Sequence, residues 1–153
     1  MYRRILIASD LTDASTPALR TAIELGRQLG VPVTALHVLE PKFEVKPWYV
    51  PFSERDQVFF RDIERREEDA ARRVLGSKVK ELLAPHEEPA QVLTRPGIPA
   101  DTIVSTARDV GADLIVVGTH GRRGFQHLVM GSVAERVARQ AQCATMIVHP
   151  EVR

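Results

Sequence analysis

Four of the protein's nine glycines stand close together in the C-terminal third of the sequence: Gly118, Gly121, Gly124 and Gly131. Ser132 follows the last of them and opens a run of residues that favour helix. Glycine serves where the backbone needs a positive φ angle or where a partner must come close. Backbone amides beside glycine, followed by a helix N-terminus, attract anions such as phosphate. The pattern therefore predicts an anion-binding loop.

Two familiar phosphate-binding motifs do not match this loop. The P-loop places a lysine between its second glycine and the following Ser or Thr, whereas Gly131 and Ser132 are adjacent. The dinucleotide fingerprint needs three glycines after the first strand, where this chain reads SDLTDAS. Both motifs are excluded, but the attraction of a glycine-flanked helix start for anions remains.

The composition favours one globular domain over residues 1–153 with an apolar core. The net charge of +1 disfavours nucleic acid as a partner. One cysteine, Cys143, excludes an internal disulfide and favours a reducing cytoplasm. The first residues turn polar at Ser9, too early for a signal peptide, and no apolar run approaches the ~20 residues that span a bilayer. We expect a cytoplasmic protein without a membrane segment.

Short apolar runs alternate with amphipathic stretches along the chain. A first helix is expected to use Thr16 as N-cap and Pro17 as its first residue, and to close at Gly30. Residues 41–60 contain three prolines and no clean period, which predicts an irregular insert. The expected strands are residues 5–8, 33–39, 90–94, 114–117 and 144–148; the later helices are 58–83, a segment with its inner face at 103–110, and one capped by Ser132.

Strands separated by helices predict parallel pairing, with crossover helices on both faces of the sheet. The expected fold class is therefore α/β, a three-layer α/β/α sandwich. Ligands of such sheets bind beyond the carboxyl ends of the strands, where the strand order reverses. If the first and fourth strands are neighbours, the loop SDLTDAS and the glycine loop share one crevice.

The spacing from Gly118 to Ser132, G-x2-G-x9-G-S, resembles the pattern of the nucleotide-binding branch of the universal stress protein family. The likeness covers most of the chain and is weakest from residue 41 to about 65. It includes RRILIASD, PGIPADTIVSTARDVGADLIVVGTHGRRG, GSVAERVARQA and CATMIVHP. The resemblance implies an adenine-nucleotide-binding fold with a five-stranded parallel sheet of order 3-2-1-4-5. That order puts the first and fourth strands side by side.

The resemblance also implies a set of ligand contacts. The phosphates of ATP, or of ADP or AMP, would lie among the backbones of Gly121, Arg122, Gly131, Ser132 and Val133, with the Ser132 hydroxyl as a further donor. Gly118 would lie by the ribose, and the backbone of Val38 by the adenine edge.

Asp10 matches the family's acidic position near the nucleotide. Its carboxylate could accept from a hydroxyl or support Mg²⁺ held mainly by phosphate oxygens, with no other direct metal ligand. Capping of its own loop is an equal alternative for Asp10. Thr12 stands where many relatives carry serine, and its hydroxyl is available.

The resulting prediction is an ATP-binding regulatory or stress-response module. The alternative is an enzyme that slowly hydrolyses ATP or transfers its nucleotidyl group, which requires a positioned base or nucleophile. Asp10, Thr12 and His120 are the only evident candidates, and they form no recognisable catalytic set. We therefore expect no enzymatic activity beyond slow ATP hydrolysis.

Residues 144–148 form the last expected strand, which the resemblance places at an edge of the sheet. This strand, ATMIV, is apolar and carries no charge or proline. Such an edge is prone to aggregation unless another chain covers it. Relatives in the family commonly meet as dimers through this strand, which implies a symmetric homodimer through Ala144 to Val148.

Overall fold

The computed structural model describes residues 1–41, 53–85, 90–119 and 131–149. Five strands alternate with four α-helices in the described ranges. In chain order they are β1 (Ile5–Ala8), α1 (Thr16–Leu29), β2 (Val33–Leu39), α2 (Glu54–Leu82), β3 (Gln91–Pro96), α3 (Pro99–Val110), β4 (Leu114–Gly118), α4 (Ser132–Gln140) and β5 (Ala144–Val148). A short 3-10 turn, Asp13–Ser15, precedes α1.

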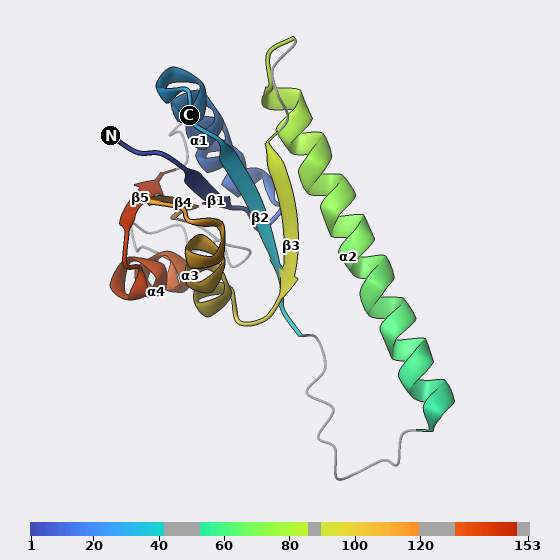
Figure 1. Cartoon of the computed structure of the whole chain (residues 1–153). Coiled ribbons are helices and arrows are strands. Elements are labelled where there is room, and N and C mark those ends of the chain that lie inside the picture. Colours follow the sequence, from blue (N-terminus) through green and yellow to red (C-terminus); the bar gives the residue numbers. More distant parts are fainter. Residues whose placement is uncertain (42–52, 86–89, 120–130, 150–153) are drawn as a thin grey trace.

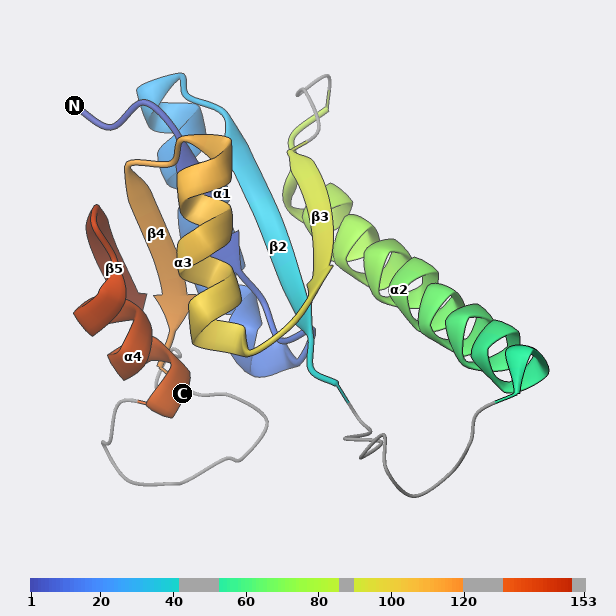
Figure 2. The same ribbon diagram turned by 60° about the horizontal axis from the view of Figure 1, so that its bottom comes forward.

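The strands form one parallel sheet of order β3-β2-β1-β4-β5, which confirms the predicted order. Helices α1 and α2 cover one face, and α3 and α4 cover the other, so the three-layer sandwich is confirmed as well (Figures 1 and 2). The central strand β1 pairs with β2 on one side and with β4 on the other.

The sequence of β1 explains its central position. Ile5 and Ile7 belong to the core beneath α1 and α2, while Leu6 belongs to the core beneath α3 and α4. All three side chains are fully buried. Successive side chains of a strand point to opposite faces, so a strand covered on both sides needs an unbroken apolar run.

Helix α1 begins one residue earlier than predicted. Ser15 is its N-cap and Thr16 its first helical residue, which leaves Pro17 inside the first turn, where its missing N–H costs nothing. The helix ends as expected at Gly30, whose φ of 65° is the left-handed conformation that glycine adopts most easily.

Helix α2 starts at Glu54, so residues 54–60 are helical and the predicted irregular insert of 41–60 was too long. Residues 42–52 of that insert lie outside the described ranges. Only the second half of α2 packs on the sheet, through Ala71, Leu75 and Val79, while the first half extends past the ends of β2 and β3 (Figure 1). The sequence analysis missed the first four residues of the helix, 54–57, because all four are polar and show no apolar period.

Two strands also differ from expectation at their ends. β3 spans Gln91–Pro96 where 90–94 was expected, and β4 extends by one residue to Gly118. Shifts of one or two residues are usual at element ends, where pairing frays.

Candidate functional site

The candidate site lies at the carboxyl ends of β1 and β4. Ala8 is the partner of Val117 in the parallel register, so Asp10 and Gly118 leave the sheet at the same edge. From β1 the chain crosses to β2 on one side, whereas β4 and β5 lie on the other. The strand order therefore reverses between β1 and β4, and such a point is where open α/β sheets bind ligands.

Ser9 anchors the loop that follows β1. Its amide donates to the carbonyl of Leu36 at 2.9 Å, and its own carbonyl lies 2.8 Å from His37 Nδ1. Its hydroxyl lies 2.8 Å from the hydroxyl of Ser15 and accepts from the amide of Leu11 at 3.1 Å. These contacts tie the loop to β2 and to the start of α1. Leu11 is held at a φ of 67°, a conformation that is rare for a residue with a side chain.

The two carboxylate oxygens of Asp10 have different surroundings. Oδ1 accepts from the Thr12 amide at 3.0 Å and from the Thr12 hydroxyl at 2.7 Å. Oδ2 is buried and has no hydrogen-bond partner in the described part of the chain. Loop capping, one of the two roles considered for Asp10, is therefore present. A buried carboxylate oxygen without a donor is costly, which leaves Oδ2 suited to a hydroxyl donor or a cation.

Thr119 closes the glycine loop at its base. Its amide donates to the carbonyl of Val148 at 3.0 Å, and its carbonyl accepts from the amide of Gly131 at 2.8 Å. Its side chain is 2% exposed. The sequence analysis did not identify Thr119 as a site residue. Its position as a polar residue directly after an apolar strand could have indicated one. Thr119 and Gly131 flank the glycine loop, so the hydrogen bond between them holds the two ends of the loop together beside β5.

The start of α4 differs from the prediction by one residue. Gly131 is the N-cap and Ser132, predicted to be the cap, is the first helical residue. The carbonyl of Gly131 accepts from the amide of Glu135, so both backbone polar groups of Gly131 are occupied. The amides of Ser132 and Val133 belong to the first turn, have no acceptor within the helix and receive no side-chain cap. Both residues are exposed.

Backbone conformation does not explain the glycine at 131. Its φ of −60° and ψ of 147° are open to any residue. Among the described glycines, positive φ occurs at Gly30, Gly97 and Gly111, and Gly118 is not among them. A positive φ is therefore not the reason for glycine at positions 118 and 131.

Val38 lies where β2 runs past the end of β1. The pairing of β1 with β2 stops at Leu36, and Val38 is paired only with Arg95 of β3. The edge of β2 that faces β1 is therefore not covered by a strand at Val38. Its half-buried side chain packs on the core beneath α3 and α4. The remaining predicted contacts, Gly121 and Arg122, lie outside the described residues, as does His120.

Residues 1–149 match the sequence model of the universal stress protein family. The chain belongs to this family. A universal stress protein of Methanocaldococcus jannaschii, MJ0531, is 30% identical over 148 residues, which cover 97% of this chain and 82% of its own length. The solved structure of the universal stress protein UspA from Lactobacillus plantarum has a TM-score of 0.77 at 21% identity, and covers 96% of this chain and 97% of its own.

Two solved universal stress proteins of this fold carry nucleotides. One, in complex with cAMP, has a TM-score of 0.64 and 22% identity and covers 98% of each chain. Another, from Archaeoglobus fulgidus and in complex with dAMP, has a TM-score of 0.53 and 24% identity and covers 95% of this chain and 97% of its own. At these identities the likeness to the present chain is one of fold.

The described ranges hold no group of three or more His, Cys, Asp or Glu side chains arranged to bind a metal ion. They also contain no helix that is both long enough and apolar enough to cross a membrane.

Proposed function

We propose that the protein binds an adenine nucleotide at the carboxyl ends of β1 and β4, with ATP and Mg²⁺ as the physiological ligand. One observation carries the proposal: at the edge where the strand order reverses, the described residues place two helix-start amides that have no acceptor within the helix and a buried carboxylate oxygen that has no donor. The nucleotides bound by two universal stress proteins of the same fold support it. Membership of the family supports a role as a regulatory or stress-response module in the cytoplasm.

Each described residue has a distinct part in this proposal. The amides of Ser132 and Val133, with the Ser132 hydroxyl, donate to phosphate oxygens. Gly131 contributes the absence of a side chain, because its amide already donates to Thr119. Gly118, which also lacks a side chain, leaves room for the ribose. The backbone of Val38 lies along the edge of the adenine.

Mg²⁺ is commonly bound by one or two carboxylates together with substrate phosphates, and a single buried Asp10 oxygen fits this requirement. When bound, the ion neutralises phosphate charge. In its absence Asp10 Oδ2 still accepts a hydrogen bond from a hydroxyl of the ligand.

Calorimetric titration with ATP in the presence of Mg²⁺ tests the proposal. We expect binding by the wild-type protein, weakened at least tenfold, or about 1.4 kcal/mol, by Gly131→Val, because the valine side chain blocks the approach of phosphate. The φ and ψ of Gly131 are open to valine, and circular dichroism should show that the variant is folded. Gly76→Val, on the far helix α2, is the matched control. Absence of binding by wild type would overturn the proposal, and full affinity in folded Gly131→Val would remove Gly131 from it.

We propose a binding role rather than an enzymatic one. Asp10 Oδ1 accepts from both the amide and the hydroxyl of Thr12, an arrangement that shapes the local turn. Among the described residues no further group joins this pair to make a recognisable catalytic set. We expect phosphate release from ATP to stay below about 1 s⁻¹, the low end of ordinary enzyme turnover. Faster release, lost on Asp10→Asn, would establish an enzyme instead.

We also propose a homodimer through β5. This strand stands at the end of the strand order with only β4 beside it, and Thr145 to Val148 are half-buried. Antiparallel pairing with a second copy across a two-fold axis would cover its free edge. Light scattering should then report twice the chain mass of 17.1 kDa, about 34 kDa.

Hydrogen exchange is the sharper test of this interface. Ile147 packs on the core beneath α3 and α4, so a charge placed there would disturb the fold together with the dimer. The amides of β5 that do not donate to β4 should be protected at high protein concentration and lose protection on dilution. A monomeric mass, or protection that does not change with concentration, would place the interface elsewhere or exclude it.

A further inference from the structure

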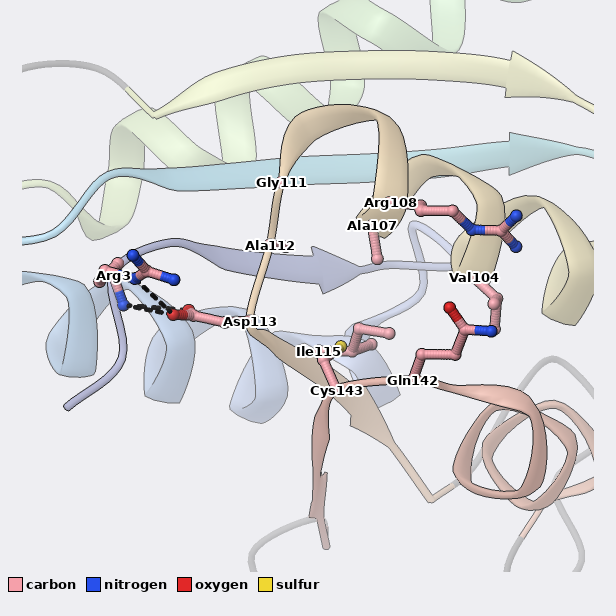
Figure 3. A pocket seen from close by; sticks show the side chains of 10 residues that line it. All are labelled: Arg3, Val104, Ala107, Arg108, Gly111, Ala112, Asp113, Ile115, Gln142 and Cys143. Atoms are coloured by element: carbon pink, nitrogen blue, oxygen red, sulfur yellow. Dashed lines mark hydrogen bonds and ion pairs between the residues drawn. The ribbon is translucent and has the colours of Figure 1, made fainter.

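A pocket lies at the edge of the sheet opposite the candidate nucleotide site, at the amino ends of β4 and β5. Its volume is about 350 Å³, within the range of small-molecule sites. Its walls come from the last turns of α3, the start of β4 and the turn between α4 and β5 (Figure 3). The candidate nucleotide site, at the carboxyl ends of the strands, shares none of these residues.

The middle of the pocket is apolar. Val104 and Ala107 face it from α3, Ile115 from β4, and the thiol of Cys143 from the residue before β5 (Figure 3). Burial, together with the negative charge of Asp113, raises the pKa of the Cys143 thiol, so this group is neutral at pH 7 and behaves as a small apolar side chain. This surface suits a short aliphatic group of a ligand.

The two ends of the pocket are polar but unequal. At one end the Asp113 carboxylate accepts from the amides of Arg3 and Arg4 at 3.0 Å and lies 3.5 Å from Arg3 Nε, so its charge is compensated. At the other end stand the Arg108 guanidinium and the Gln142 carboxamide (Figure 3).

Neither Arg108 nor Gln142 has a side-chain partner among the residues that the structure describes. The acidic neighbour of Arg108 on α3, Asp109, is engaged by Arg95 of β3. An unpaired guanidinium beside an amide donor is a site for a carboxylate, because guanidinium matches the two carboxylate oxygens in geometry and charge.

We infer that this pocket binds a small monocarboxylate with a branched aliphatic body. The carboxylate pairs with Arg108 and accepts from the Gln142 amide, while the aliphatic body packs on Val104, Ala107 and Cys143. The compensated pair of Arg3 and Asp113 closes the far end and limits the length of the ligand.

Titration of the full-length protein with 3-methylbutanoate, followed by NMR, tests this inference. We expect chemical-shift changes at the Gln142 side-chain amide and at the methyl groups of Val104 and Ala107. Acetate carries only the charge and 3-methylbutanol only the aliphatic body, so each should bind at least tenfold more weakly. Alkylation of Cys143, the single cysteine, should slow in the presence of 3-methylbutanoate.

Three variants complete the test. Arg108→Gln should weaken binding of 3-methylbutanoate at least fivefold, whereas Arg73→Gln, an exposed arginine of α2, should leave it unchanged. Val104→Phe should abolish binding by filling the pocket from its half-exposed side. The inference is overturned by the absence of shifts at these residues, by equal losses in Arg108→Gln and Arg73→Gln, or by unchanged binding in Val104→Phe. None of these outcomes depends on the nucleotide site.

Discussion

The carboxylate of Asp10 holds Thr12 with one oxygen only. Oδ1 accepts from both the amide and the hydroxyl of Thr12, at 3.0 and 2.7 Å, while Oδ2 is buried and has no partner among the described residues. The same side chain therefore shapes its loop and keeps one acceptor for a ligand. This division allows the two roles to be separated by mutation.

Asp10→Asn should weaken nucleotide binding about tenfold, or 1.4 kcal/mol, with little loss of stability. An asparagine can keep a carbonyl oxygen on Thr12 but places an NH₂ group where Oδ2 lies, which removes the charge and the acceptor. Thr12→Val, which removes a donor to Oδ1 alone, is the comparison variant and should bind more tightly than Asp10→Asn. Calorimetry checks the affinities. Equal binding by Asp10→Asn and wild type would show that Oδ2 does not face the nucleotide.

Two helical glycines should respond oppositely to alanine. A Cβ at Gly26 would lie 2.3 Å from Val33 Cγ2 and 3.2 Å from the Val31 carbonyl, so Gly26→Ala should destabilise by about 1–3 kcal/mol. Nothing lies within 4 Å of a Cβ at Gly76, so Gly76→Ala should stabilise by about 0.5–1 kcal/mol through helix propensity. Urea denaturation measures both changes. A stabilised Gly26→Ala would mean that α1 and β2 separate without cost.

Adjacent residues of α2 provide a second pair. Leu75 is fully buried, so Leu75→Ala should lower the free energy of unfolding by about 2–5 kcal/mol. Val74 is 45% exposed, and Val74→Ala should change the free energy of unfolding by no more than about 0.5 kcal/mol. Thermal or urea unfolding distinguishes them. Similar costs at both positions would show that the exposed side of α2 is covered in solution.

Asp113 should make the free energy of unfolding depend on pH in the acidic range. The amides of Arg4 and then Arg3 lower its pKa below the ordinary value of about 3.9, by favouring the charged form. Its contribution is therefore full above the unfolded-state pKa and is lost as pH falls through the lowered folded-state pKa. Wild type should exceed Asp113→Asn in unfolding free energy at pH 7, and the difference should shrink below about pH 4. A difference that does not change with pH would contradict this.

Local sequence patterns determined most of the architecture. The unbroken apolar run of β1 indicated a strand covered on both faces, because alternate side chains of a strand must be buried in both layers. The glycines and Ser132 located the candidate anion site through their spacing, which also carried the family resemblance. These patterns can be recognised in the sequence because the alternation of buried and exposed residues in a helix or strand repeats every few residues.

Tertiary structure decided what depends on residues far apart in the chain. The contact of Gly131 with Thr119, the burial of Asp10 Oδ2 and the pairing of β1 with β4 all arise from packing. Sequence analysis also missed the early start of α2 at Glu54, since residues 54–57 are all polar and show no apolar period. Sequence patterns record each residue's own preference for a conformation, whereas the partners of an oxygen or an amide are fixed only when distant segments meet.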